Sequence, residues 1–165
     1  MKKYFLAFLI SLPLLAQERF PIEDPHLLSL GVGIFNIVRN KKAANFQIEC
    51  RFNHSLYKNS RMFIRPLAGV MATSNGASYY YGGIAFDFFL FNQIVFTPSF
   101  APGIYLKGKG MDLGFPLEFR SSIELSYRLK NKSRFGSMFY HISNASLGSK
   151  NPGTECLVFF YMIPL

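Results

Sequence analysis

The sequence predicts an all-β fold, an eight-stranded antiparallel transmembrane β-barrel. Aromatic residues make up 17% of the chain, with 19 Phe and 9 Tyr, and such enrichment favours strands over helices. Short segments that alternate apolar and polar residues are separated by turns rich in Gly, Asn, Ser and Lys. After residue 16, no stretch approaches ~18 consecutive apolar residues, so the sequence offers no transmembrane helix.

The N-terminus is typical of an export signal. Lys2 and Lys3 precede the apolar run YFLAFLISLPLLA, which is too short to span a bilayer comfortably. Cleavage after Ala16 would divide the chain into a signal peptide, residues 1–16, and one barrel domain, residues 17–165. A short membrane anchor is the alternative, but it fits less well because polar, proline-containing sequence follows at once.

Eight segments with strand patterning follow one another from residue 27 onward. They span residues 27–38, 44–53, 61–72, 78–91, 93–106, 113–129, 134–144 and 154–165. The second segment places Phe46 and Ile48 on one face and Gln47 and Glu49 on the other. The sixth, FPLEFRSSIELSYRL, alternates for longer than the ~5–6 residues that are usual in soluble sheets. Strands of this length with one apolar and one polar face are typical of a transmembrane barrel.

The polar faces of these segments predict the content of the barrel interior. In a membrane barrel the apolar faces turn outward to lipid, and eight strands leave a lumen just wide enough for side chains. We expect a network of paired charges there, formed by Glu49, Arg51, Arg65, Asp87, Glu118, Arg120, Glu124 and Arg128. The alternative is a soluble lipocalin-like barrel with an apolar lumen, which would leave these long, complementary charged faces in solvent.

Four prolines conflict with simple strand pairing, because a closed barrel has no free edge to accommodate them. We expect these residues at rims or bulges: Pro66, Pro98, Pro102 and Pro116. The two cysteines are predicted to be free. Cys50 faces lipid on the second segment and Cys156 faces the lumen on the eighth, with the first strand between them. That separation exceeds the ~7 Å between Cα atoms that a disulfide allows.

The connections can be assigned to the two sides of the membrane. With eight strands both termini lie on the periplasmic side, and the odd-to-even connections are extracellular. These connections are RNKKAA, TSNGA, KGKGMD and ASLGSKNPG. Three of them carry lysine, including Lys41, Lys107 and Lys150, and these cations suit anionic lipid headgroups. Basic loops that only keep the barrel soluble during assembly explain the pattern equally well.

The run HISNASLGSKNPGTE contains the polar residues that flank the last of these loops. His141 and Ser143 share the parity of Phe135 and Phe139, so they face lipid if those aromatic side chains do. Glu155 begins the outward-facing set of the next strand. Polar groups are costly against lipid and are therefore functional candidates.

These residue types are those of a nucleophile, a base and an orienting acid. Ser143 would attack an ester carbonyl, His141 would take its proton, and Glu155 would hold the imidazole. Residues at i and i+2 on one strand face lie ~7 Å apart at Cα, within reach of a Ser–His hydrogen bond. Asn144 and nearby backbone N–H groups are expected to donate to the oxyanion. His26 and His54, at the periplasmic end, have no such neighbours and are assigned no role.

The motif resembles the C-terminal signature of the lipid A 3-O-deacylases (PagL-type), a family of outer-membrane esterases. The resemblance covers His141, Ser143, Asn144, the NPG at 151–153 and Glu155, and it extends to chain length, signal peptide and strand pattern. It implies an enzyme of the bacterial outer membrane that hydrolyses the ester-linked 3-hydroxyacyl chain at position 3 of lipid A. It further implies a Ser–His–Glu triad on the outer barrel surface, with no metal and no other cofactor. One departure is the ending YMIPL, where such barrels usually end in an aromatic residue.

An outward-facing site suits lipid A, because acyl chains lie against the barrel wall and the scissile ester lies at the rim. Phe135, Phe139 and Leu157 are expected to line the acyl groove and Lys150 to bind the substrate, although plain lipid contact explains the apolar three as well. Lipopolysaccharide and the membrane are the expected partners, and nucleic acid is not. The sequence does not decide between a monomer and a homodimer.

Two other functions are consistent with the sequence. The first is a non-enzymatic small outer-membrane barrel with a structural or adhesive role, although the short loops leave little surface for it. The second is a soluble lipid-binding barrel.

Overall fold

The computed structural model describes residues 24–39, 42–91 and 93–165, so the predicted signal peptide and Lys41 lie outside the described residues. This part of the chain contains no helix long and apolar enough to cross a membrane. The strands are β1 (Leu27–Phe35), β2 (Ala43–Arg51), β3 (Tyr57–Lys58), β4 (Met62–Thr73), β5 (Ser78–Leu90), β6 (Ile94–Leu106), β7 (Leu117–Arg128), β8 (Arg134–Ser143) and β9 (Thr154–Pro164).

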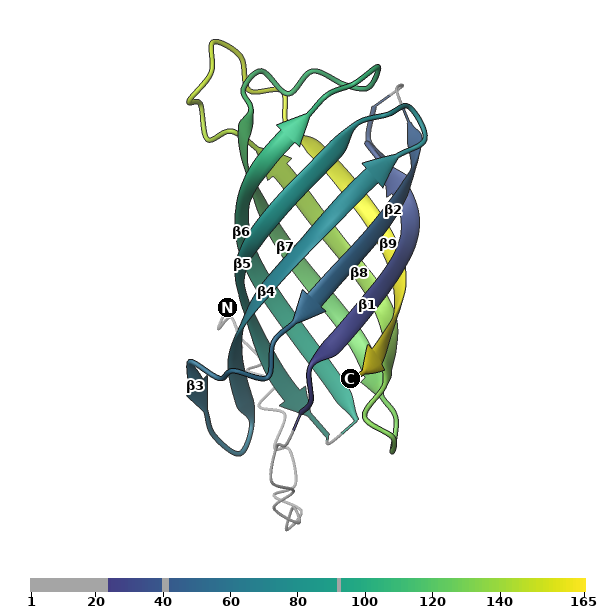
Figure 1. Ribbon diagram of the computed structural model, residues 1–165, viewed down its shortest axis with the longest axis vertical. Helices are drawn as coiled ribbons and strands as arrows, with labels where there is room; N and C mark the ends of the chain where they lie inside the picture. Colours follow the sequence, from purple (N-terminus) through teal and green to yellow (C-terminus); the bar gives the residue numbers. More distant parts are fainter. Residues whose placement is uncertain (1–23, 40–41, 92) are drawn as a thin grey trace, which may run out of the picture.

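Eight long antiparallel strands close into a barrel, as Figure 1 shows. The order is β2-β1-β9-β8-β7-β6-β5-β4-β3, and pairing between β2 and β4 closes the ring. The two-residue strand β3 pairs with β4 beyond the point where β2 leaves it, so it lies outside the ring. The eight-stranded antiparallel barrel predicted from the sequence is therefore confirmed.

The predicted boundary that differs most is the start of β7. The sequence pattern placed it near residue 113, whereas the strand begins at Leu117. Gly114 adopts a φ of 97°, which breaks the extended backbone, and Pro116 follows it. Residues 113–116 therefore belong to the loop beside the candidate site.

Three of the four prolines lie inside strands, so the expectation of rims or bulges is wrong for Pro66, Pro98 and Pro102 and holds only for Pro116. The β5–β6 register is the same on both sides of the two β6 prolines, with Ser78 opposite Leu106 and Phe88 opposite Phe96. No extra residue is inserted. Both prolines pair with β7, and pairing with β5 is interrupted at each. The missing N–H is thus accommodated on one side of the strand.

The lumen contains the predicted charge network. In the upper part of this network, the Glu49 carboxylate accepts hydrogen bonds from Arg120 (2.7 Å), Arg51 (3.0 Å) and the Tyr81 hydroxyl (3.1 Å). The Arg120 guanidinium also lies 4.1 Å from the centroid of the Tyr81 ring. Glu118 is buried in the lumen too, but it makes no ion pair with another described residue. These contacts fill the interior below the upper rim with paired charge, except at Glu118, whose carboxylate oxygens have no hydrogen-bond partner among the described residues.

Asp87 joins the upper and lower parts of the network. Its carboxylate contacts Arg65 (2.8 Å), Arg134 (3.1 Å) and Arg51 (3.5 Å), and it accepts a hydrogen bond from the Thr97 hydroxyl (2.7 Å). Arg51 continues to Glu124, at 2.5 Å.

The lower end of the lumen is closed by Asp24, which precedes β1. This fully buried carboxylate pairs with Arg65 and Arg134, and also with Arg128 at 3.2 Å. The predicted network was right in its location, and every predicted member except Glu118 makes an ion pair; Asp24 and Arg134 are additions to it.

The outer face is apolar, as the alternation predicted. Phe46 and Ile48 are more than half exposed, whereas Gln47 and Glu49 are buried. Cys50 is partly exposed and Cys156 is fully buried, and both are free cysteines. The connections TSNGA, KGKGMD and ASLGSKNPG lie at one end of the barrel together with the end of β1 and the start of β2, and the C-terminus lies at the other end (Figure 1).

Candidate active site

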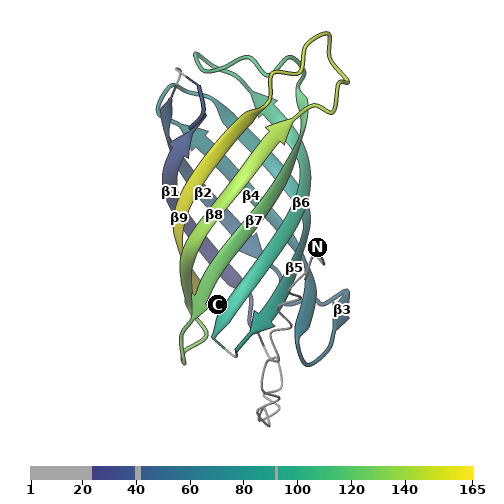
Figure 2. The same cartoon turned by 180° about the vertical axis from the view of Figure 1, so that it is seen from behind.

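The candidate site lies on the outer wall where β8 and β9 approach the loop end of the barrel. Figure 2 shows these strands side by side, with β7 next to them. Their register places His141 directly opposite Glu155. Imidazole Nδ1 and carboxylate Oε1 are 3.2 Å apart, and the side chains are 42% and 26% exposed. The two strands thus bring the predicted base and the predicted orienting acid together on one outward face.

The contact with Glu155 sets which nitrogen of the imidazole faces the carboxylate. A carboxylate accepts hydrogen bonds only, so a hydrogen bond in this pair would be donated by Nδ1 of His141 and would leave Nε2 free to accept a proton from a nucleophile. Ser143, the last residue of β8, lies on the same face two residues further along the strand and is partly exposed. Among the described residues no hydrogen bond joins Ser143 to His141. Such bonds often tighten only in the complex with substrate.

The side chain of Asn144 is buried and braces the loops around the site. Its Nδ2 donates to the carbonyls of Leu113 (2.8 Å) and Lys150 (3.0 Å), which uses both amide hydrogens. Its Oδ1 accepts from the backbone N–H of Ser146 (3.0 Å). The signal for this placement was present in the sequence, because Asn144 has the lumen parity and its neighbour Ser143 does not. The oxyanion role of Asn144 stays a prediction.

The residues after Asn144 have an unusual backbone. Ala145 and Ser146 both adopt positive φ, 51° and 65°, which costs of order 1–3 kcal/mol for each non-glycine residue. The Asn144 backbone N–H donates to Oδ1 of Asn151 (3.1 Å), so the two ends of the loop are tied together. Local strain of this kind is found preferentially at functional sites.

Apolar side chains surround the polar group on the outer wall. Phe139 lies opposite Leu157, one rung below His141 and Glu155, and Phe135 lies two rungs further down. All three face outward as predicted. An acyl chain placed over them would meet a mainly apolar surface, with Ser137 between Phe135 and Phe139.

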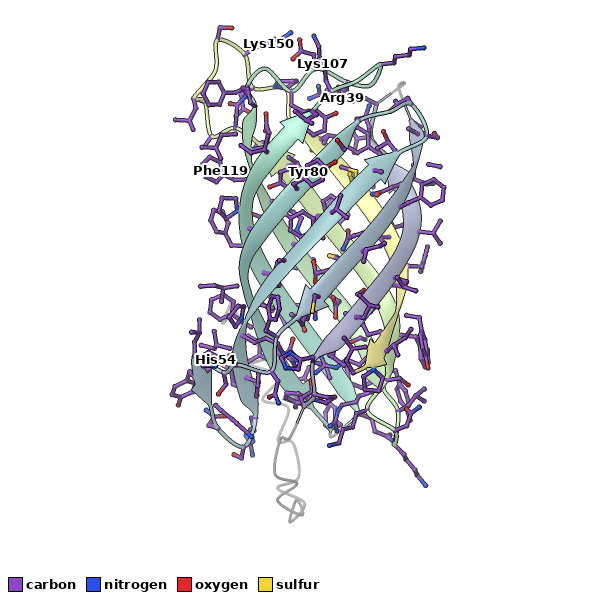
Figure 3. The ribbon with its side chains drawn as sticks, viewed as in Figure 1. Arg39, His54, Tyr80, Lys107, Phe119 and Lys150 are labelled. Carbon is purple, nitrogen blue, oxygen red and sulfur yellow. The ribbon has the colours of Figure 1, made fainter. Side chains whose placement is uncertain are left out.

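Sequence reasoning missed Phe119 on β7. This side chain lies directly opposite Ser143 and stacks on Phe100 with ring centroids 5.9 Å apart (Figure 3 labels Phe119). The register of β7 against β8 makes it a neighbour of the serine, and no local pattern in the sequence carries that register.

The loop cations lie above the site, where Figure 3 labels Arg39, Lys107 and Lys150. Lys150 Nζ is 3.1 Å and Lys107 Nζ 3.5 Å from the same oxygen of Asp112. The hydrogen bond from Lys150, followed by one from the Gly114 backbone, lowers the pKa of Asp112. Lys150 is therefore at the rim as predicted, but it is held by a carboxylate.

The two remaining histidines lie at the opposite end of the barrel. His54 is labelled there in Figure 3, and His26 Nδ1 accepts a hydrogen bond from the Asn53 backbone N–H (3.1 Å). In the part of the chain that the structure describes, no three His, Cys, Asp or Glu side chains are arranged to hold a metal ion.

Comparison with known proteins gives one family, and the solved structures of similar fold include two outer-membrane proteins. The profile of the family "Lipid A 3-O-deacylase (PagL)" matches residues 43–164. The crystal structure of the outer membrane enzyme PagL is 20% identical, with a TM-score of 0.68 over 84% of this chain and 99% of that chain. The Yersinia pestis outer membrane protein Ail is 11% identical, with a TM-score of 0.49 over 85% of this chain and all of Ail. Among curated proteins the search found no match.

Proposed function

The chain belongs to the lipid A 3-O-deacylase (PagL) family, and from this premise we propose that it removes the ester-linked 3-hydroxyacyl chain from position 3 of lipid A. It would act in the bacterial outer membrane as a carboxylic ester hydrolase. The contact between His141 and Glu155, on the outer wall next to Ser143, is the observation that carries this proposal. A polar pair at that place has no role in the lumen network and would be costly against lipid without a function.

The chemistry would proceed through an acyl-enzyme. Ser143 Oγ attacks the ester carbonyl while Nε2 of His141 takes the hydroxyl proton. The tetrahedral intermediate collapses as His141 returns that proton to the sugar oxygen, which leaves as the 3-hydroxyl of the deacylated lipid. A water molecule then attacks the acyl-serine, again with His141 as base, and releases the fatty acid. Glu155 stabilises the imidazolium that forms in both halves.

For the oxyanion we propose Asn144 together with the loop backbone that follows it. The amide of Asn144 already donates to two carbonyls, which favours a role in shaping the loop over direct donation. The backbone N–H groups of Ala145, Gly148 and Ser149 are then the proposed direct donors, because those of Ser146 and Leu147 already donate to Asn144. Removing one such donor costs about 10²–10³ in kcat in serine hydrolases.

The apolar wall supports a lipid substrate. The acyl chain would contact Phe139, Leu157 and Phe135. The Lys150 ammonium would leave Asp112 and pair with a phosphate of lipid A. All three proposed triad residues come from one chain, so the proposed chemistry requires no homodimer.

Mass spectrometry of lipid A from cells that express the protein tests this function. The wild type should remove one 3-hydroxyacyl chain, and Ser143→Ala should not. Ser60→Ala is the control, because Ser60 is an exposed serine between β3 and β4, at the opposite end of the barrel. Unchanged lipid A in a folded, inserted sample would instead favour the structural or adhesive role. Full activity of Ser143→Ala would show that the nucleophile is another residue.

A further inference from the structure

Gly153 lies directly beneath the reactive edge of the His141 imidazole. A Cβ added to this glycine would lie 2.7 Å from Cε1 and 3.1 Å from Nε2 of the ring. Separations below 3.0 Å are essentially never seen for real Cβ atoms, so a side chain here requires the ring to move. Gly153 also has a φ of 61°, which is a left-handed conformation.

The strand register shows why this contact concerns catalysis. Ile142 and Thr154 form the last β8–β9 pair, and one further step in the same register places Gly153 opposite Ser143. The imidazole originates one rung below, opposite Glu155, and its Nε2 edge lies over Gly153. The ring therefore leans from its own rung toward that of the serine, and the missing side chain leaves the space it occupies.

The backbone at Gly153 is held in place and cannot easily retreat from a larger side chain. Arg39 donates a hydrogen bond to the Pro152 carbonyl at 2.5 Å. Before Gly153 in the chain, the Asn144 backbone N–H donates to Oδ1 of the Asn151 side chain, and after it Thr154 pairs with Ile142. Gly153 itself is buried. In a substituted protein the exposed imidazole is consequently the part that moves.

We propose that Gly153 is a positioning residue of the hydrolase, which seats the imidazole so that Nε2 can reach Ser143. Glu155 holds the Nδ1 end of the ring, and the bare backbone of Gly153 supports the Nε2 end. This inference rests on the proposed function. It assigns a second reason for glycine in the NPG turn, because the space above it matters in addition to its φ.

Three variants separate the space from the backbone conformation. Gly153→Ala adds a Cβ and strains φ, whereas Gly153→Asn adds the same Cβ but tolerates a left-handed backbone better. Gly76→Ala is the matched control in another loop at the same end. Gly76 has a φ of 82°, and a Cβ there meets nothing closer than 4.0 Å, so this variant carries only the strain.

The readouts are kcat and KM for lipid A hydrolysis in detergent, and the rate at which a fluorophosphonate labels Ser143. Heat-modifiable migration on gels verifies folding. We expect both Gly153 variants to lose about 100-fold or more in kcat, as for a ~1 Å misplacement of a catalytic group, with little change in KM. Labelling should fall in parallel, and Gly76→Ala should match the wild type. Activity in Gly153→Asn with loss only in Gly153→Ala would overturn the proposal in favour of strain.

A second set of variants, made in a protein that lacks the His141 ring, covers the case in which a Gly153 variant does not fold. In a His141→Ala background the ring is absent, so Gly153→Asn, which tolerates the left-handed backbone better, should fold as well as its parent and change the residual activity no further. A folding defect that persists there would overturn the proposal, since the defect would then arise from the backbone. The proposed function is tested separately. It fails if Ser143→Ala hydrolyses lipid A at the wild-type rate and is still labelled.

Discussion

Asp87 is the carboxylate on which the lumen network depends most, and Asp87→Asn is the substitution that tests it. The residue is fully buried and contacts three arginines at 2.8–3.5 Å. Removing one partner of a buried pair costs about 3–5 kcal/mol, because the other charge stays buried and uncompensated. Each arginine keeps another carboxylate in the variant: Arg65 and Arg134 keep Asp24, and Arg51 keeps Glu49 and Glu124. We therefore expect a loss at the small end of this range, about 3 kcal/mol.

Equilibrium unfolding in urea, with the protein in detergent micelles, measures this loss. The chain has no Trp, so far-UV circular dichroism of the β-structure is the suitable signal. With a slope of about 1–3 kcal/mol per molar urea, the midpoint should fall by ~1–3 M. Asp112→Asn, which removes an exposed carboxylate, is the control and should not move the midpoint measurably. An unchanged or higher midpoint for Asp87→Asn would refute the reasoning, because it would mean that relief of desolvation outweighs the lost pairing.

Three further predictions concern the site. Glu155→Gln should lower kcat about 10²–10⁴-fold with little effect on the midpoint of unfolding, and near-normal turnover would exclude an orienting role. Asn144→Ala should accelerate amide hydrogen exchange in residues 113–116 and 145–151 as well as lowering kcat; a lower kcat with unchanged exchange would instead indicate direct oxyanion donation. Since the pKa of Asp112 is lowered, its contacts with Lys150 should be complete above the ordinary value of 3.8 and be lost only as the pH falls below it. The Gly114 amide resonance should report this titration, and Lys150→Ala should move its midpoint upward.

Strand alternation is a local property, and it predicted much of the fold. The faces of β2 and β7 follow from residue order alone, as do the buried positions of Glu49 and Arg120. The three prolines inside strands were misplaced because alternation does not show on which side of a strand a missing N–H falls. For Pro98, only the strand pairing in the barrel shows that the interruption falls on the β5 side and that pairing with β7 is kept.

The sequence by itself determined that His141, Ser143 and Glu155 share one outward face, because parity along a strand depends only on residue number. Only the tertiary structure decided that His141 lies opposite Glu155, that Phe119 lies opposite Ser143, and that the ring rests on Gly153. These neighbours follow from the register between strands and from the path of a strained loop. Register is set by closure of the whole ring and by hydrogen bonds such as those of Asn144, which join residues far apart in the chain.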